Sequence, residues 1–281
     1  MGSTMIEIGP ALAVAVLLFV VIGATAAWLG ETGQTREIPW TAIRAALQLV
    51  ALSLVIGYVA DRLWLVAAFA VVMASVASWA AARRVTAPRR ARAPRGAKAR
   101  RGAGARRGAG ASRSAGVRRG LGAGARDALW CAVPVALPPV ILTCGLFAAG
   151  VVRPNGLSII PVVGILLGNA MAVAGLAGRR AHDELDTRHG EVEAALALGF
   201  TAPTARMMVC REAAATSLQP SLDQTRTIGL VTIPGAFVGM VLGGARPWEA
   251  GVMQLFVSTG ILACGAVALV VTTRLVAAGR L

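Results

Sequence analysis

The chain has 281 residues, of which 56% are hydrophobic, and its mean hydropathy is +0.69. Soluble domains are about 45–50% apolar, so this composition argues against a soluble fold and indicates an integral membrane protein. The formal net charge is +15, but 15 of the 28 Lys and Arg residues lie in residues 83–126, which contain no Asp or Glu. The other 13 basic residues balance 13 acidic ones, so the excess charge belongs to one segment and not to a nucleic-acid-binding fold.

The apolar runs predict an all-α membrane protein with about seven spans, each near the length that a helix needs to cross ~30 Å of hydrocarbon. The first run has no preceding Lys or Arg and contains Glu7 in its leading segment, so we interpret it as an uncleaved span and not as a signal peptide. Residues 1–82 then hold three spans and residues 127–281 hold four, within one membrane domain. The predicted spans are 8–29, 41–60, 63–82, 128–152, 157–176, 227–244 and 251–273.

The distribution of Lys and Arg predicts the orientation of these spans. With residues 83–126 inside and the spans alternating, the outside loops hold only Arg62, Arg153 and Arg246. This places the N-terminus outside and the C-terminus inside, in a multi-pass protein of the inner or plasma membrane.

Residues 83–126 lack apolar periodicity and are predicted to be disordered on the cytoplasmic side. Three roles remain open for this segment: an orientation signal, adhesion to anionic lipid, and nucleic-acid binding. The last lacks interleaved aromatic residues for base stacking, so no specific nucleic-acid partner is expected.

Polar residues inside two spans are candidates for a transport path or a gate. Arg44 and Gln48 lie four residues apart on one face of the second span, where they would face the bundle interior, although Arg44 could also reach the interface. Asn169, in the sequence GNAM of the fifth span, would either join helices or line the path.

The polar interval between the fifth and sixth spans has helical order. Glu191 and Glu193 are expected in the first turn of a short helix, and Gly199 can take the left-handed conformation that ends it. Thr201 is expected to cap a second helix with Pro203 in its first turn. Two helices joined by a tight turn predict a rigid cytoplasmic structure on which a partner could push.

The sixth span is the most irregular one. Asp223 and Arg226 are three residues apart and can pair along the helix that leads into it. Pro234 and Gly235 interrupt it, and broken helices often mark the moving or solute-contacting part of a transporter. A glycine stripe then permits close helix packing, either within the chain or in a homodimer. Its members are Gly235, Gly239 and Gly243.

Motifs of ATP binding and of common catalytic sites are absent from the sequence. No GxxxxGK[ST] loop occurs, and the only lysine is Lys98. No HExxH, GxSxG or kinase motif occurs either. The four cysteines show no CxxC spacing, which argues against a zinc site. We therefore expect no enzyme activity, no cofactor and no metal site in this chain.

The stretch Glu193-Ala194-Ala195-xxx-Gly199 resembles the EAA loop of ABC-transporter permeases, which docks on the ATP-binding subunit. Together with GNAM, EAALALGFTAP and PSLDQTRTIGLVTIPG, it is similar to the FetB-type permeases, a family associated with iron export and, in plants, with aluminium tolerance. The similarity spans the chain except residues 83–126, which are longer than the basic loop usual in that family.

This resemblance implies a permease subunit that acts as a dimer beside a separate ATP-binding subunit, in which ATP and Mg²⁺ would be bound. It also implies that residues 193–199 are the coupling helix, within a coupling region at 179–226, and that the cargo is an exported metal ion such as iron or a related small solute. The polar residues of the path lack the Cys, His and carboxylate groups typical of metal routes, so iron follows from the resemblance alone. A stand-alone transporter or channel, or a membrane anchor with a basic recruiting loop, are the alternatives.

Overall fold

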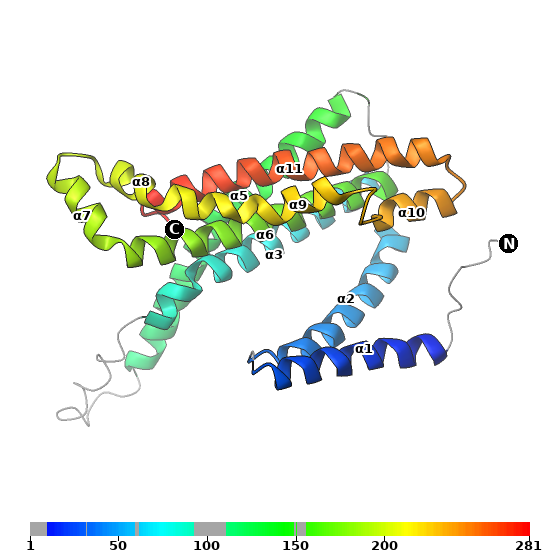
Figure 1. Ribbon diagram of the computed structural model, residues 1–281, viewed down its shortest axis with the longest axis horizontal. Helices are drawn as coiled ribbons and strands as arrows, with labels where there is room; N and C mark the ends of the chain where they lie inside the picture. The colour runs from blue at the N-terminus through cyan, green and yellow to red at the C-terminus, as the bar shows by residue number, and fades with distance from the viewer. Residues whose placement is uncertain (1–9, 32, 60–61, 93–110, 149, 151–155) are drawn as a thin grey trace. The chain divides into compact units, whose positions relative to one another are not determined.

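The computed structural model describes residues 10–31, 33–59, 62–92, 111–148, 150 and 156–281. Apart from one isolated pairing of Ile228 with Thr232, the regular structure of these residues is helical, as predicted. The chain forms two compact units (Figure 1). The first contains α1 (Pro10–Leu29) and α2 (Glu37–Val59), and the second contains the helices from α3 to α11.

Six helices of the described residues are long and apolar enough to cross a membrane, so the chain is a multi-pass membrane protein. They are α1, α2, α3 (Leu63–Arg92), α5 (Ala111–Ala148), α6 (Gly156–Thr187) and α11 (Pro247–Ala277). The side of the membrane on which each end lies stays a prediction.

The seventh predicted span, residues 227–244, is wrong as a single helix. α9 (Gln219–Thr227) ends before it, and α10 (Gly235–Leu242) is only about 12 Å long at about 1.5 Å per residue. Residues 228–234 between them are not helical, because Gly229 has a φ of +80° and Pro234 lacks an amide hydrogen. The predicted interruption at Pro234 is therefore confirmed, and it begins earlier than the sequence indicated.

α6 and α11 lie side by side and run in the same direction (Figure 1). The chain between them must therefore return along the bundle, and it does so in short pieces: α8 (Ala202–Ala215), the 3-10 turn Thr216–Leu218, α9 and α10. The residue numbers of the facing pairs rise together along both helices: Leu166 with Gly260, Asn169 with Ile261, and Val173 with Gly265.

Small side chains bring α3 and α6 together at the centre of the larger unit. A Cβ atom at Gly178 of α6 would lie 2.6 Å from the side chain of Val85 on α3, so only glycine fits this contact. Val85 is fully buried there, beside Ala177 and Ala181 of α6. Close approach through small residues is how membrane helices gain dispersion contacts without help from the hydrophobic effect.

The basic segment is helical at both of its ends. α3 continues to Arg92 and α5 begins at Ala111, so the prediction of disorder is wrong for residues 83–92 and 111–126. Ala and Arg are strong helix formers, and each stretch extends a helix that is already nucleated in a span. Residues 93–110, the rest of this prediction, lie outside the described residues.

Candidate functional site

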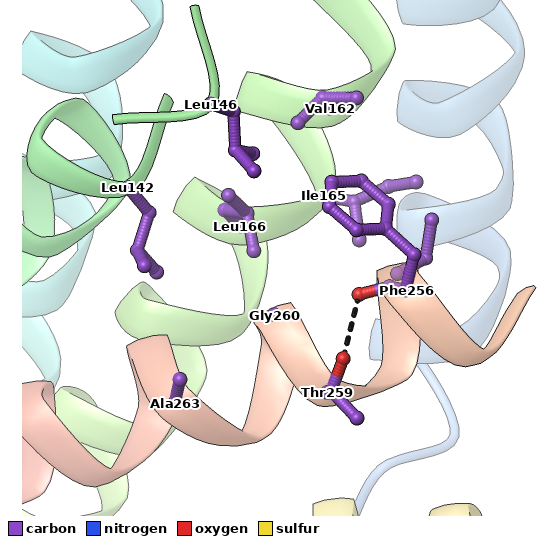
Figure 2. Close-up of a pocket in the computed structure, with 10 residues that line it drawn as sticks. Leu142, Leu146, Val162, Ile165, Leu166, Phe256, Thr259, Gly260 and Ala263 are labelled. Atoms are coloured by element: carbon purple, nitrogen blue, oxygen red, sulfur yellow. Dashed lines mark hydrogen bonds between the residues drawn. The ribbon is translucent and has the colours of Figure 1, made fainter. Parts of the chain in front are cut away.

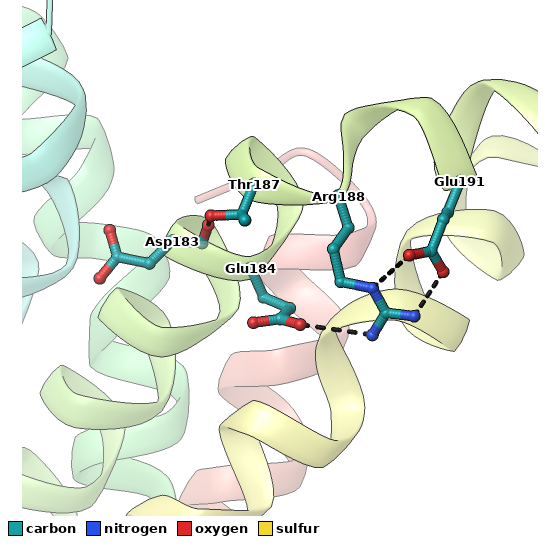
Figure 3. Close-up of polar contacts among 5 residues, drawn as sticks. All are labelled: Asp183, Glu184, Thr187, Arg188 and Glu191. Carbon is teal, nitrogen blue, oxygen red and sulfur yellow. Dashed lines mark hydrogen bonds and ion pairs between the residues drawn. The ribbon is translucent and has the colours of Figure 1, made fainter.

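The junction between α6 and α7 (His189–Ala197) is held by one arginine. Arg188 donates to Glu184 of α6 at 3.3 Å, and two of its N–H groups donate to Glu191 of α7, one of them at 2.5 Å (Figure 3). These hydrogen bonds keep the pKa of Glu191 below its usual range. Because one guanidinium donates hydrogen bonds to carboxylates of both helices, these bonds hold α6 and α7 at a fixed angle at their junction.

The turn after α7 has the predicted geometry. Gly199 has a φ of +88°. Its amide donates to the carbonyl of Leu196 at 3.0 Å, and the amide of Phe200 donates to that of Ala195 at 3.1 Å. These two bonds form a Schellman ending, so the prediction that Gly199 ends the helix in the left-handed conformation is confirmed.

Two details of the predicted helix pair are wrong. α7 begins at His189, so Glu191 lies in its first turn but Glu193 does not; Glu193 instead lies 3.3 Å from His189 Nδ1. Thr201 occupies the N-cap position of α8, but its hydroxyl contacts the hydroxyl of Thr204 at 2.8 Å, and it bonds no backbone amide. Pro203 lies in the first turn of α8, as predicted.

A small core joins α7 to its neighbours. Val192 of α7 packs with Ala205 and Val209 of α8, and all three are buried. Leu185 of α6 completes the cluster. The segment from α7 to α8 is therefore a packed unit and not a loose loop. Its outer surface includes the exposed residues Glu193, Ala194, Gly199, Thr201 and Pro203, with Ala195 half-buried.

Large apolar side chains lie exposed around the same turn. Leu198 is 79% exposed, and Leu196, Phe200 and Met208 are also exposed. Apolar groups that cluster on a polar helix pair mark an interaction surface more often than an accident of packing. We call this surface, defined by Leu196, Leu198, Phe200 and Met208, the apolar tip.

Asn169 joins three helices. Its Nδ2 donates to the carbonyl of Ile261 on α11 at 2.9 Å, and its Oδ1 accepts from the hydroxyl of Ser221 on α9 at 2.9 Å. A Cβ atom at Gly265 would lie 2.8 Å from Asn169 Nδ2, so the amide needs glycine opposite it. Of the two predicted roles for Asn169, the structure supports the joining of helices.

The remaining path candidates lie in three places. Asp223 and Arg226 pair on α9 at 3.1 Å, as predicted, and both side chains are exposed. Pro234 is the N-cap residue of α10, and Gly235 is its first residue. Arg44 and Gln48 are both exposed on α2, in the first unit, one helical turn apart. Their role in a path stays a prediction.

The glycine stripe of α10 has no helix against it among the described residues of the larger unit. A Cβ atom at Gly235 or Gly239 would meet nothing within 4 Å, and one at Gly243 would meet only carbonyls of its own helix. Packing among the described residues of the larger unit therefore does not use the stripe. Contact with a second copy stays a prediction.

Two of the cavities in the larger unit differ in chemistry. One, of about 280 Å³, is lined almost entirely by apolar groups such as Leu142, Leu166 and Phe256 (Figure 2). Its single hydroxyl, on Thr259, already donates to helix carbonyls at 2.9 and 3.0 Å. The other, of about 430 Å³, lies at the interruption between α9 and α10, and its largely apolar walls include the polar side chains of Gln254 and Ser258.

Metal-ligating side chains do not converge among the described residues: no three of His, Cys, Asp and Glu come together there. The sequence did not point to three further residues. Ser221 and Gly265 position Asn169, and Gln254 lines the cavity at the interruption between α9 and α10. Gln254 and Gly265 within the apolar helix α11 were the available signal, since such residues usually serve packing or hydrogen bonding between spans, whereas Ser221 lies in the polar helix α9 and gave no such signal.

An apolar bundle of spans with a polar helix pair at one end defines a multi-pass membrane protein. The family described as "Uncharacterised protein family (UPF0014)" matches residues 10–98 and 116–279, so the chain belongs to this family. The family model leaves only residues 99–115 of the basic segment unmatched. The part of the chain that is additional to the family is therefore shorter than the residues 83–126 that the motif resemblance excluded.

Curated relatives share this family. The chain is 39% identical to "Protein ALUMINUM SENSITIVE 3" of Arabidopsis thaliana over 41% of this chain and 42% of the relative. It is 37% identical to "UPF0014 membrane protein STAR2" of Oryza sativa subsp. japonica over 42% and 41%. It is 26% identical to "Probable iron export permease protein FetB" of Escherichia coli over 46% and 50%. The chain thus spans half or less of the length of these relatives, and no solved structure matches it.

Proposed function

We propose that this chain is the membrane-spanning permease subunit of an ATP-driven transporter and that a separate ATP-hydrolysing subunit docks on α7 and the apolar tip. The sequence lacks a phosphate-binding loop, so energy from ATP must enter through a partner. One relative carries the name of an iron export permease, which supports a metal ion such as iron or a related small solute as cargo and export as the direction.

One observation carries this proposal: a stiff helix pair outside the spans exposes large apolar side chains. Arg188 braces the base of α7, Gly199 ends it sharply, and Leu198 at the turn is 79% exposed. A transporter that works alone has no use for such a surface, whereas a docking partner would cover it and remove apolar area from water.

The connections of α8 support a mechanical role for this pair. Arg206 of α8 donates to the carbonyl of Ala277 at the end of α11, at 3.4 Å. Through the 3-10 turn, α8 leads into α9, where Ser221 contacts Asn169. A displacement of α7 and α8 would therefore be transmitted to α11 and to the interruption before α10. In the proposed cycle, this displacement shifts the bundle between two arrangements.

Co-purification tests the proposal. The chain is expressed together with a candidate ATP-binding cassette subunit from the same genome, and the complex is isolated through a tag on the chain. Leu198→Glu is expected to reduce recovery of the partner at least tenfold, because it places a charge in a buried apolar contact. Leu242→Glu makes the same substitution at an exposed leucine at the end of α10 and is expected to leave recovery unchanged.

Two outcomes would overturn the proposal. Equal recovery of the partner with Leu198→Glu and with wild type would remove the docking role of the apolar tip. Transport in vesicles that contain this chain without any ATPase would instead favour the stand-alone transporter.

A further inference from the structure

The cavity of about 430 Å³ lies at the interruption between α9 and α10. We call it the break cavity; it lies between the non-helical stretch 228–234 and α11. Gly229, Pro234 and Phe237 line one side, and Gln254 and Ser258 of α11 line the other. This volume falls in the range of pockets that hold small molecules.

Gln254 has a buried hydrogen-bond acceptor that no described residue satisfies. The residue is 8% exposed. Its Nε2 contacts Ser258 Oγ at 3.1 Å, but its Oε1 is buried and accepts no hydrogen bond from the described residues. Ser258 cannot supply that bond, because its hydroxyl already donates to the Gln254 carbonyl at 2.8 Å. A buried acceptor without a donor destabilises a protein, so a glutamine at this position calls for a donor other than the described residues.

The break also leaves backbone amides without helical partners at the start of α10, where Phe237 lines the cavity. The first hydrogen bond of α10 runs from Val238 to the carbonyl of Pro234, which leaves the amides of Gly235, Ala236 and Phe237 without helical partners. Within a membrane bundle, irregular backbone of this kind is tolerated where it lines a cavity that water or a solute can enter.

The break cavity carries no charge to balance that of an ion. None of its lining side chains is ionisable, and none is a Cys, His or Met. The charged residues of α9, Asp223 and Arg226, pair with each other and are 64% and 68% exposed, so neither neutralises the cavity. A bare multivalent cation would lose its water here without gaining a carboxylate or a soft ligand.

We propose that the break cavity binds a small uncharged organic solute that donates an O–H or N–H hydrogen bond to Gln254 Oε1 and lays an apolar face against Phe237. As cargo, this class rests on the proposed function, and iron would then enter the cavity only inside an uncharged organic complex. The binding itself does not depend on an ATPase.

The test uses two probes that share an aromatic ring with two oxygen substituents, of which only one probe carries hydrogen-bond donors. Catechol is uncharged at pH 7 and offers two hydroxyls on an aromatic ring, and 1,2-dimethoxybenzene has the same ring without donors. Binding to the full chain in metal-free nanodiscs is measured by ligand-observed NMR. Wild type is expected to bind catechol roughly tenfold more tightly than the ether, since one buried hydrogen bond is at stake. Gln254→Leu is expected to abolish this preference.

Matched variants keep the test decisive. Thr259→Val alters a hydroxyl on the same helix that faces the apolar cavity, and it is expected to keep the catechol preference. Gln254→Glu retains the shape of the side chain and adds a charge, so it is expected to gain binding of ferrous iron that wild type lacks; it also serves if Gln254→Leu fails to fold. Three results would each overturn the proposal. The first is equal binding of catechol and the ether by wild type, and the second is a catechol preference that persists in Gln254→Leu. The third is ferrous iron binding by wild type that Gln254→Leu loses.

This result is separable from that of the docking experiment. Gln254→Leu is expected to leave co-purification with the ATP-binding subunit intact, and Leu198→Glu is expected to leave catechol binding intact. If Leu198→Glu leaves recovery of the partner unchanged while the wild-type chain still prefers catechol, the docking role is refuted and this inference stands.

Discussion

Replacement of Asn169 by alanine is expected to loosen the contact among α6, α9 and α11. The substitution removes the hydrogen bond to Ile261 and the acceptor of Ser221, both at 2.9 Å. Hydrogen bonds between membrane helices average about 0.6 kcal/mol, and a buried hydroxyl that loses its acceptor adds about 1 kcal/mol. Ser221 is 8% exposed, so water does not replace the lost acceptor. We therefore expect the free energy of unfolding to fall by about 2 kcal/mol.

A double-mutant cycle isolates the part of this loss that belongs to the pair. Reversible unfolding in mixed micelles is measured for wild type, Asn169→Ala, Ser221→Ala and the double variant. Because the two side chains contact each other directly, a coupling energy of about 0.6–1 kcal/mol is expected. Strict additivity of the two single losses would show that the contact is not energetically significant and would refute this reasoning.

Gly265 provides a second test of the same geometry. A methyl group there would lie 2.8 Å from Asn169 Nδ2, so Gly265→Ala is expected to lower the free energy of unfolding by about 1–3 kcal/mol. In the Asn169→Ala background the loss should shrink but not vanish, because Leu218 Cδ1 would still lie 3.0 Å from the added Cβ. An identical loss in both backgrounds would mean that the amide does not set the need for glycine.

Three further outcomes are expected. Gly199→Ala, at a φ of +88°, should destabilise the end of α7 by about 1 kcal/mol, seen as faster amide hydrogen exchange in α7 and α8 but not in α11. Gly178→Ala, which would place Cβ 2.6 Å from the Val85 side chain, should lower the free energy of unfolding by about 1–3 kcal/mol, and Val85→Ala should restore part of it. Because Arg188 lowers the pKa of Glu191, the contribution of this pair is fully present above the ordinary carboxylate pKa and is lost as pH falls through the lower folded-state value. The protection of α7 amides, after correction for intrinsic exchange, should therefore fall as pH falls below the ordinary carboxylate pKa, and Arg188→Ala should remove that dependence.

Each of these has a contradicting result. Unchanged exchange in Gly199→Ala would mean that the turn tolerates a side chain. A Gly178→Ala protein as stable as wild type would show that α3 and α6 can separate without loss. Exchange in α7 that depends on pH equally with and without Arg188 would assign the effect to another group.

The helical class and most span positions were predictable because they rest on local rules. Apolar runs of span length, the glycine that ends α7 and the proline in the first turn of α8 act through neighbouring residues, and the structure confirms them. The error at residues 227–244 has a local cause too. The hydropathy of residues 227–244 predicts one continuous helix, but the positive φ of Gly229 and the missing amide hydrogen of Pro234 are incompatible with it.

The start of α7 shows where local reasoning ended. Glu193 fits a first turn by sequence, but Arg188 bridges Glu184 and Glu191 and thereby starts the helix at His189. The helices of the basic segment are a second case. Composition predicts disorder, while the adjoining spans extend their helices into it.

The sequence by itself determined that this protein is a helical, multi-pass membrane protein with a capped helix pair between its spans and no ATP-binding loop, since composition, apolar length and turn residues act at short range. Only the tertiary structure decided what Asn169 does and where a solute could bind. Ser221 and Gly265 lie 52 and 96 positions from Asn169 (221 − 169 and 265 − 169), and Gln254 lies 20 positions beyond Pro234. Those meetings follow from the parallel course of α6 and α11 and from the broken return between them, which no local pattern specifies.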